Sequence, residues 1–446
     1  MHTENKMGTM QMDRLLLEIS TPMILSMLVQ ALYNIVDSYF VSEIGEDALT
    51  SVSICFPMQT LIIACSVGLG VGMNSLLSRA LGEKRGEYAN KISNVGIFMF
   101  FCLGLMFAFV GLFFTDAFID SQKVTDSIKT VSKGYMKVVM TVSMPLCFSI
   151  CFERLLASTG RTFYTMLTQC SGAVTNIILD PIFIFVLGQG VRGAAIATVI
   201  GQGVGMICGL MFHHLKNQEL RLDFSYMRPD RKIMMEALEI GLPTIVMQSI
   251  ASLTILVFNS ILSGFSGTAI AFYGVYFKLQ SFIILPIIGL ANGLMPIVAY
   301  NYGAKNRQRI ILAIKYAVIF SMSIMAFGVL LFQIFPAQIL GIFHASNDML
   351  KIGIPALRTI SISYIFASVL IMMSAVYQGL GSGVPSLTVS LIRQVGFLIP
   401  TAYYFSLSGD INKVWYSFII AELGASLVSI FITKSVFTKL DFESDF

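Results

Sequence analysis

Charged residues are scarce in this chain. Lys, Arg, Asp and Glu make up 12% of its 446 residues, about half the share that is usual in soluble proteins. Apolar residues make up 56%, and the mean hydropathy is +0.78. A soluble fold always leaves part of its apolar surface in water, so it cannot hide this much. The composition therefore excludes a set of soluble domains and predicts an integral membrane protein.

The sequence also lacks the motifs of enzymes and of ATP-driven pumps. It contains no Gly-x-x-x-x-Gly-Lys-Ser/Thr nucleotide loop, no His-Glu-x-x-His motif and only four histidines. All seven cysteines lie in apolar runs, which favours buried small side chains over disulfides or metal ligands. We therefore expect no enzyme activity, no metal site, no cofactor and no nucleic-acid partner.

Twelve apolar segments are long enough to cross a bilayer as helices, which takes about 20 residues each. They show no barrel-type alternation, so an all-α membrane protein with twelve transmembrane helices is predicted. The segments are 15–42, 49–79, 92–115, 134–158, 163–187, 192–215, 235–263, 268–301, 310–335, 355–379, 385–407 and 412–436.

The charges of the loops predict the orientation. Lys and Arg gather in the loops around residues 79–91, 161, 216–232 and 305–315, whereas the loops at 43–47 and 116–133 are acidic or mixed. The two kinds alternate from one crossing to the next. Because cytoplasmic loops carry the excess of Lys and Arg, we expect both termini on the cytoplasmic side of the plasma (inner) membrane.

The chain repeats itself at a distance of 221 residues. This one shift superimposes the following pairs: Pro22 and Pro243, Gln59 and Gln280, Gly68 and Gly289, Gly72 and Gly293, Gly82 and Gly303, Gly160 and Gly381. Six helices in each half give both halves the same orientation. The repeat therefore predicts two parallel six-helix lobes that are related by a pseudo-two-fold axis along the membrane normal.

The repeat also sets the expected domain organisation. We expect a cytoplasmic tail (1–14), an N-lobe (15–215), a cytoplasmic linker (216–234), a C-lobe (235–436) and a second tail (437–446). Lobes related in this way enclose a central cleft, which is where transporters bind substrate and around which the lobes rock. The alternative is a duplicated inert scaffold. A two-lobed chain forms its cleft alone, so a monomer surrounded by membrane lipids is expected.

Two aspartates lie well inside the predicted N-lobe. By residue count, Asp37 and Asp180 both sit roughly 8–12 Å below the outer surface. Asn34 and Asn176 precede them by three and four residues, which puts each amide on the face of its carboxylate. Thr198 reaches a similar depth from the next helix, and no basic residue of this lobe does so. The sequence therefore predicts a polar cluster.

Such a cluster suits the binding of a coupling ion. Two adjacent carboxylates in a medium of low dielectric constant share one proton readily, and the same oxygens would coordinate a desolvated Na⁺. Either event changes the local charge and would bend the first helix, where Pro22 removes one backbone hydrogen bond. The alternative is that each aspartate only hydrogen-bonds a neighbouring helix.

The C-lobe has no copy of this cluster. The 221-residue shift places Phe258 and Thr401 opposite the two aspartates. Its own buried charges are Lys278, Arg393 and Glu422, and we interpret them as candidates for contact with substrate in the cleft. Lys278 and Glu422 both lie roughly 15 Å deep by residue count, so we expect them to pair, either as a structural bond or as part of the substrate site.

Other ionisable residues fall near the predicted ends of spans. Long side chains there reach the membrane surface, so we interpret these residues as structural. They are Glu18, Lys137, Glu153, Arg154 and Glu239.

Taken together, these motifs resemble those of the multidrug and toxic compound extrusion (MATE) transporters, in particular the prokaryotic branch related to DNA-damage-inducible-type and staphylococcal multidrug efflux members. The resemblance covers essentially the whole chain. The residues that carry it are Pro22 with Asn34-x-x-Asp37, Gly45 with Ala48-Leu49, Arg79-Ala-Leu-Gly82, Asn176-x-x-x-Asp180-Pro181, and Gly193-Ala-Ala leading to Thr198.

The resemblance implies efflux of cationic or hydrophobic drugs, and hence antibiotic resistance, in exchange for H⁺ or Na⁺. It assigns the ion site to Asp37, Asn176, Asp180 and Thr198, and a bending point to Pro22. Another branch of the family uses acidic residues in helices 7 and 10. Here helix 7 offers only Gln248 and Asn259, and helix 10 has no carboxylate. Coupling is therefore expected in the N-lobe, with Gln248 and Asn259 as further cleft candidates.

The alternative is a flippase of lipids or lipid-linked oligosaccharides from the same wider superfamily. In that case Arg393 and Lys278 would hold a pyrophosphate. The acidic N-lobe residues and the undivided repeat of six plus six helices favour the exporter.

Overall fold

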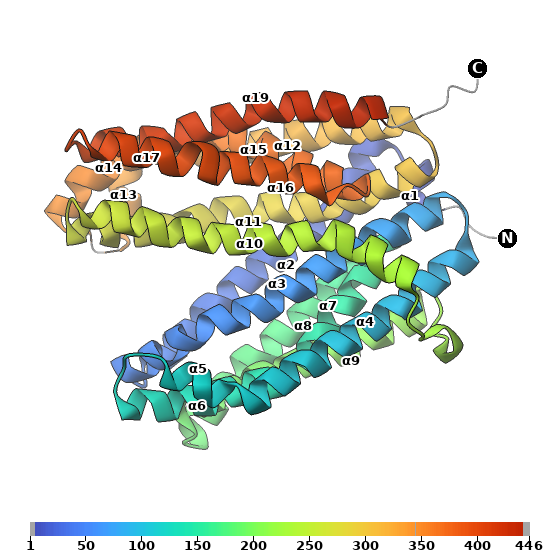
Figure 1. The fold of residues 1–446 in the computed structure, drawn as a ribbon, viewed down its shortest axis with the longest axis horizontal. Coiled ribbons are helices and arrows are strands. Elements are labelled where there is room, and N and C mark those ends of the chain that lie inside the picture. The colour runs from blue at the N-terminus through green and yellow to red at the C-terminus, as the bar shows by residue number, and fades with distance from the viewer. Residues whose placement is uncertain (1–4, 344, 440–446) are drawn as a thin grey trace.

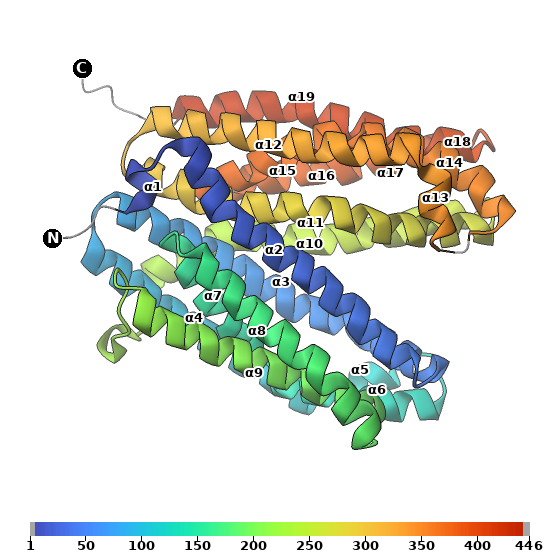
Figure 2. The same cartoon turned by 180° about the vertical axis from the view of Figure 1, so that it is seen from behind.

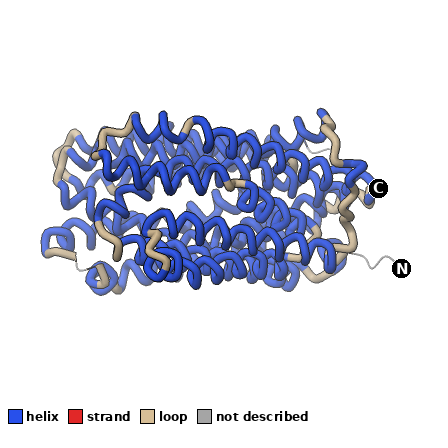
Figure 3. The backbone as a smooth tube through the Cα atoms, turned by 90° about the horizontal axis from the view of Figure 1, so that it is seen from below, coloured by secondary structure: helices blue, strands red, loops and turns tan. Residues whose placement is uncertain are grey.

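The chain folds into helices almost throughout (Figure 3). The computed structural model describes residues 5–343 and 345–439, and these ranges contain no β-strand. Residues 1–4, 344 and 440–446, which include parts of both predicted tails, lie outside the described residues.

The helices of the first half are α1 (Lys6–Thr9), α2 (Met12–Ser42), α3 (Glu46–Gly82), α4 (Gly86–Phe113), α5 (Thr115–Asp120), α6 (Asp126–Thr141), α7 (Met144–Ser158), α8 (Thr162–Pro181), the π-helix η1 (Ile182–Val186) and α9 (Gly190–Lys216). A linker with the short helix η2 (Phe224–Tyr226) follows. The second half contains α10 (Arg231–Ser263), α11 (Gly267–Gly303), α12 (Arg307–Ile334), α13 (Pro336–Gly341), α14 (Asn347–Ile362), α15 (Tyr364–Gly379), α16 (Gly383–Leu391), the π-helix η3 (Ile392–Leu398), α17 (Ile399–Ser406), α18 (Ile411–Val414) and α19 (Tyr416–Lys439).

The twelve predicted spans all appear as helices. Nine stretches of the described chain are long and apolar enough to cross a membrane by themselves, and the bent pairs α6–α7 (44°) and α14–α15 (47°) bring the number to eleven. The twelfth span is divided into α16, η3 and α17. The π-helix η1 follows Pro181, and η3 ends two residues before Pro400. Because proline has no N–H to donate, the regular bond pattern is interrupted there and a wider turn takes its place.

The helices form two bundles, the N-lobe (α2–α9) and the C-lobe (α10–α19), as predicted (Figures 1 and 2). The bundles meet near the end of the molecule where both termini lie, which we call the terminal end, and they diverge toward the other end. Between the lobes, α2 packs on α11, and α3 packs on α10 and α11. The contact of α2 with α11 and the contact of α3 with α10 are equivalent under the repeat, because α2 corresponds to α10 and α3 corresponds to α11.

Glycines allow the lobes to touch through their backbones at the terminal end. A Cβ atom added to Gly82 would collide with the backbone oxygen of Tyr300, and one added to Gly303 would collide with the backbone oxygen of Arg79. The two contacts are equivalent under the 221-residue shift, because Gly82 corresponds to Gly303 and Arg79 corresponds to Tyr300. Only glycine permits so close an approach. The pseudo-two-fold axis therefore passes between Gly82 and Gly303.

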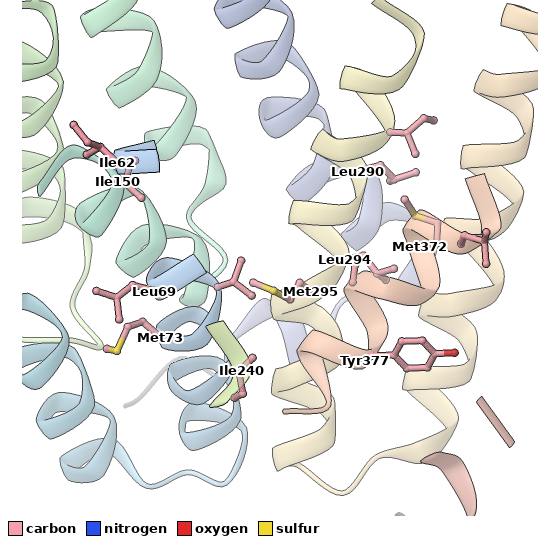
Figure 4. Close-up of a cluster of buried hydrophobic side chains, with 14 of the residues drawn as sticks. Ile62, Leu69, Met73, Ile150, Ile240, Leu290, Leu294, Met295, Met372 and Tyr377 are labelled. Atoms are coloured by element: carbon pink, nitrogen blue, oxygen red, sulfur yellow. The ribbon is translucent and has the colours of Figure 1, made fainter. Parts of the chain in front are cut away.

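A buried apolar core continues from these contacts into both lobes. Figure 4 shows part of it, with Leu69 and Met73 from α3 and Leu294 and Met295 from α11. Each of the four is at most 5% exposed. The lobes thus share one core at the terminal end, which seals this end of the space between them.

The N-terminal helix α1 bridges both lobes at the same end. The backbone oxygen of Met7 accepts hydrogen bonds from Asn301 Nδ2 and Arg309 Nη2 of the C-lobe, both at 3.1 Å. Asn5 Nδ2 donates to the Glu219 carboxylate on the linker at 2.9 Å. Asn5 and Met7 therefore join the linker to the C-lobe.

The linker is itself bound to the N-lobe. Asn94 Nδ2 donates to the backbone oxygen of Arg221 at 2.9 Å, and the Lys91 ammonium pairs with the Asp230 carboxylate at 2.5 Å. The hydrogen bond from Lys91 lowers the pKa of Asp230, so the pair stays charged at neutral pH. Asp230 also caps the N-terminus of α10 by accepting from Lys232 N. The C-lobe thus begins directly after an anchored residue.

Candidate functional site

A cavity of about 960 Å³ lies between the two lobes. Its walls come from α2, α3 and α6–α9 of the N-lobe and from α10, α11, α15, α16 and η3 of the C-lobe. Sites for small molecules usually occupy roughly 300–1,000 Å³. The cavity is therefore large enough for an organic compound of drug size, and it occupies the place predicted for the central cleft.

The two predicted aspartates meet at the N-lobe wall of this cavity. Asp37 lines the cavity, whereas Asp180 is fully buried behind it. Their carboxyl groups lie close enough to interact with each other, and Asp180 Oδ2 is buried without a hydrogen-bond partner within the described residues. Two adjacent carboxyl groups in a medium of low dielectric constant share one proton readily, so the pair is suited to bind a proton. Asp37 connects the pair with the cavity, because it belongs to the cavity lining and Asp180 does not.

Asn176 and Thr198 complete the cluster as predicted by their spacing. Asn176 Nδ2 donates to Asp180 Oδ1 at 3.3 Å and to Thr198 Oγ1 at 3.2 Å. Asn176 Oδ1 is buried and has no hydrogen-bond partner within the described part of the chain. A buried amide oxygen that has no partner and lies beside two carboxylates is suited to coordinate a cation or to accept a hydrogen bond.

Glycines bring the two helices of this cluster together. A Cβ atom on Gly201 of α9 would lie 2.7 Å from the backbone oxygen of Gly172 on α8, closer than real side chains approach. Without side chains at these positions, α9 lies directly against α8. This contact places Thr198, almost one helical turn before Gly201, beside Asn176.

Two tyrosines belong to this wall and were not predicted. Tyr33 of α2 lies close to Thr198, and Gln59 Nε2 donates to the Tyr135 hydroxyl at 3.0 Å. Both tyrosines line the cavity. An aromatic residue in an apolar helix looks the same in sequence whether it faces lipid or a cavity. One signal was available, because Tyr33 lies one helical turn before Asp37.

Asn34 and Pro22 differ in part from the expectation. Asn34 lies on the cavity wall, but its side chain makes no hydrogen bond within the described residues. It therefore flanks the cluster without joining its bonds. Pro22 lies within α2, which runs without interruption from Met12 to Ser42. Bending of α2 at Pro22 stays a prediction.

The C-lobe candidates separate into two groups. Gln248 and Arg393 line the cavity, whereas Asn259, Lys278 and Glu422 are not part of its lining. The predicted pair of Lys278 and Glu422 is wrong: Arg393 Nη1 contacts Glu422 Oε1 at 3.3 Å, and Lys278 is exposed on α11 without an ion pair in the described ranges. Counting residues gives the depth of a side chain but not its direction around the helix axis, so two charges at equal depth need not face each other.

Aromatic side chains fill the place in the C-lobe that corresponds to the acidic cluster. The Phe258 ring stacks on Tyr273 with centroids 5.0 Å apart, and it lies edge-on to Phe418 at 5.1 Å. Phe258 is fully buried. In the C-lobe, therefore, a buried aromatic cluster occupies the position equivalent to Asp37.

Glu153 and Arg154 were predicted to be structural residues near the end of a span, but both line the cavity. They are 7% and 8% exposed. Gln169 Nε2 donates to Glu153 Oε2 at 2.9 Å, and Arg154 Nη1 reaches across to Asn292 Oδ1 of the C-lobe at 3.4 Å. The span that holds them is bent between α6 and α7, so α7 runs along the cavity and not parallel to the preceding half of the span.

Comparisons with known proteins agree with this architecture. The family model described as MatE matches residues 22–182 and 243–404, and its two parts begin 221 residues apart, at the distance of the sequence repeat. Multidrug export protein MepA from Staphylococcus haemolyticus is 27% identical over 434 residues, covering 95% of this chain and 94% of the relative.

Solved structures are similar over nearly the full length. The outward-facing conformation of a multidrug resistance MATE family transporter of the MOP superfamily has a TM-score of 0.93 and 26% identity, with 98% of each chain covered. A MOP superfamily transporter from Pyrococcus furiosus, described by a reverse polarity of its binding pocket, has a TM-score of 0.92 and 26% identity, again with 98% of each chain covered. The family match spans both lobes, and it confirms what the motifs of the sequence indicated: the chain belongs to the MatE family.

Proposed function

We propose that this protein is a secondary exporter that moves cationic or hydrophobic organic compounds, multidrug substrates among them, out of the cell in exchange for H⁺ or Na⁺. The observation that carries the proposal is the carboxylate pair Asp37 and Asp180 at the wall of the cavity between the lobes. The names of similar proteins, a multidrug export protein and a multidrug resistance transporter, support the same class of substrate.

The cluster couples the two fluxes because ion and substrate compete for the same negative charge. A proton or Na⁺ that binds to the pair removes one negative charge and weakens the attraction for a cationic substrate in the cavity. After the lobes have rocked, the ion leaves on the other side, and the restored charge attracts the next substrate. Na⁺ would be held by oxygens of Asp37, Asp180, Asn176 and Thr198. No ATP and no organic cofactor enter this cycle.

We propose the orientation that the loop charges predict, with both termini on the cytoplasmic side of the plasma membrane. The lobes then close toward the cytoplasm, and their diverging ends face the outside. The protein works as a monomer surrounded by lipids, because one chain encloses the whole cavity, and it binds no nucleic acid.

The test is the transport of a fluorescent organic cation into inverted membrane vesicles. A pH gradient and a Na⁺ gradient are imposed in turn on vesicles with the wild type or Asp37→Asn. We expect the wild type to accumulate the dye with one of the two gradients, which identifies the coupling ion, and Asp37→Asn to show no accumulation with either. The proposal fails if the variant accumulates the dye like the wild type.

Glu153 is expected to contribute to the affinity for cations without taking part in coupling. A charge-assisted contact contributes about 1.5–3 kcal/mol, so Glu153→Gln should raise the half-saturating concentration of an organic cation about tenfold or more. Gln keeps the length of the side chain and a carbonyl that can accept the bond from Gln169. The measurement is uptake against substrate concentration, with an uncharged hydrophobic substrate as the control that should not change. Equal losses for both substrates would contradict a charge-specific role.

The flippase is the second candidate, and the arginines of the cavity favour it. Arg154 and Arg393 both line the cavity and would bind a pyrophosphate. Lys278, the other cation expected to do so, is not part of the lining. Each arginine also lies close to a glutamate, Glu153 beside Arg154 and Glu422 beside Arg393, which lowers the positive potential. If neither gradient moves any of a panel of organic cations, transfer of a lipid-linked pyrophosphate should be measured next.

A further inference from the structure

A second pocket lies at the terminal end of the N-lobe, apart from the cavity between the lobes. Its volume is about 310 Å³, at the lower end of the range for small-molecule sites. Its lining comes from α1, from the beginnings of α2 and α8, and from the linker, which lie at this end of the molecule (Figure 2). The described lining residues of the pocket and of the cavity have no member in common. The pocket is therefore separate from the site proposed for transport.

The helix α8 begins at this pocket. Its first residue, Thr162, belongs to the lining, as do Arg161 before it and Phe163 after it. No side chain of the described residues caps this end of α8. The first N–H groups of a helix have no partner within the helix, and the helix dipole makes this end positive. Such an end is suited to bind a phosphate group.

Two side chains beside the first turn of α8 have buried polar atoms without a partner. Thr162 is 1% exposed, and its Oγ1 makes no hydrogen bond with any described residue. The Nε atom of Arg161 is also buried, and it has no partner in the same part of the chain. Native structures leave few buried polar atoms unpaired, because each one costs free energy. A hydroxyl and a guanidinium N–H at one place therefore point to a ligand that accepts hydrogen bonds.

Arg161 is the positive charge of this pocket that lacks a counterion. The Lys6 ammonium pairs with the Glu18 carboxylate at 2.7 Å. The Glu219 carboxylate accepts from Asn5 Nδ2 at 2.9 and 3.0 Å. Arg161 forms no ion pair within the described ranges, neither with Glu219 nor with Glu18. Its guanidinium is therefore available to an anion.

The turn before α8 brings a second cation to the edge of the pocket. Gly160 has a φ of +76°, a conformation that favours glycine. A Cβ atom added to Gly160 would lie 3.4 Å from Lys6 Cε. The side chain of Lys6 thus packs on the residue directly before Arg161, and both cations belong to the lining.

The equivalent helix end in the C-lobe is covered by protein. The 221-residue shift places Ser382 and Gly383 opposite Arg161 and Thr162. A Cβ atom added to Gly383 would lie 2.6 Å from the backbone oxygen of Ile240, so α10 packs directly on the beginning of α16. The N-lobe has a pocket, a guanidinium and a hydroxyl at this position. Packing of the helix end therefore does not require these polar residues.

We propose that this pocket binds a phosphate group, with the first turn of α8, Arg161 and the Thr162 hydroxyl as its donors. Two sources supply such a group, the headgroup of an anionic phospholipid and a soluble phosphate compound. In the proposed orientation the terminal end faces the cytoplasmic surface, where anionic headgroups gather. Phe163 of the lining is 53% exposed, which suits contact with lipid. Binding here is independent of transport through the cavity.

The experiment measures the binding of a fluorescent short-chain phosphatidic acid to the purified full-length protein in detergent, by fluorescence anisotropy. Arg161→Gln should raise the dissociation constant about tenfold, and Thr162→Val, which keeps the shape of the side chain without the hydroxyl, about fivefold. Arg228→Gln is the matched control, because Arg228 is an exposed arginine of the linker outside the lining, and it should bind the lipid like the wild type. An organic cation should bind equally to all of these proteins, which shows that the variants are folded.

Competition identifies the source of the phosphate group. Displacement of the probe by inorganic phosphate at the same concentrations as unlabelled phosphatidic acid assigns the pocket to a soluble phosphate compound. Displacement by the lipid at concentrations about tenfold lower assigns it to a phospholipid headgroup. The inference is overturned if Arg161→Gln binds the probe like the wild type. It is also overturned if Arg161→Gln and Arg228→Gln weaken binding equally, because binding then reflects only the positive charge of this surface.

Discussion

Replacing Gly82 by alanine is expected to abolish transport, because the lobes can then no longer close at the terminal end. The added Cβ would collide with the backbone oxygen of Tyr300, and a backbone oxygen cannot rotate out of the way. Extra volume in a tightly packed contact costs about 1–3 kcal/mol. Two conformations of a protein often differ by only a few kcal/mol, so this cost shifts the population toward the state that is open at the terminal end.

The measurement is the distance between spin labels on the two lobes at this end, at positions 87 and 308, both exposed in the structure. The labels are attached in a background that lacks the seven native cysteines. Gly82→Ala should lengthen the distance and reduce dye accumulation to background. Gly86→Ala is the matched control, because a Cβ atom there meets nothing within 4 Å, and it should behave like the wild type. An unchanged distance with normal transport in Gly82→Ala would show that the glycine contact does not set the closed state.

The sequence predicted the fold almost completely, and the reason is the bilayer. Within lipid every backbone group must bond internally, so an apolar run of sufficient length has few alternatives to a helix. The repeat then related the two halves. Gly82 contacts Tyr300, and Gly303 makes the equivalent contact with Arg79. Both contacts follow from the pseudo-two-fold symmetry. The bends between α6 and α7 and between α14 and α15 were not predicted, because hydropathy is summed along the chain and does not register the direction of a helix.

The sequence predicted those contacts of the site that depend on residue spacing within one helix. It missed the contacts that depend on which face of its helix a side chain occupies. Asn176 and Asp180 lie one turn apart on α8, so their contact follows from helix geometry. Glu422 bonds Arg393, not Lys278, because residue counts fix the depth of a side chain and not the face of its helix. The place of Glu153 in the cavity wall depends on the bend before α7, which no local pattern indicated.

Replacing Asp180 by asparagine is expected to eliminate gradient-driven uptake while leaving the binding of organic cations largely intact. Asp180 is fully buried and is not part of the described lining of the cavity, whereas Asp37 is. Asparagine at position 180 cannot share a proton with Asp37, and its neutral amide binds Na⁺ more weakly than a carboxylate does, whereas the charge of Asp37 itself remains. The pair could then no longer alternate between a bound and a released ion. Substrate would still reach Asp37, so its dissociation constant should change by less than about threefold, which corresponds to less than about 0.7 kcal/mol.

Two measurements on the same preparations separate coupling from binding. Dye accumulation under the driving gradient should fall to background in Asp180→Asn, and the fluorescence anisotropy of the dye should give a dissociation constant close to that of the wild type. Asp116→Asn is the control, because Asp116 belongs to the same lobe but pairs with Lys137 at 2.7 Å outside the lining of the cavity, and it should retain both activities. If Asp180→Asn accumulates the dye normally, the carboxylate pair is not the coupling site. If it loses dye binding as well, Asp180 acts on the substrate through Asp37, and the separation of an inner ion site from an outer substrate contact is wrong.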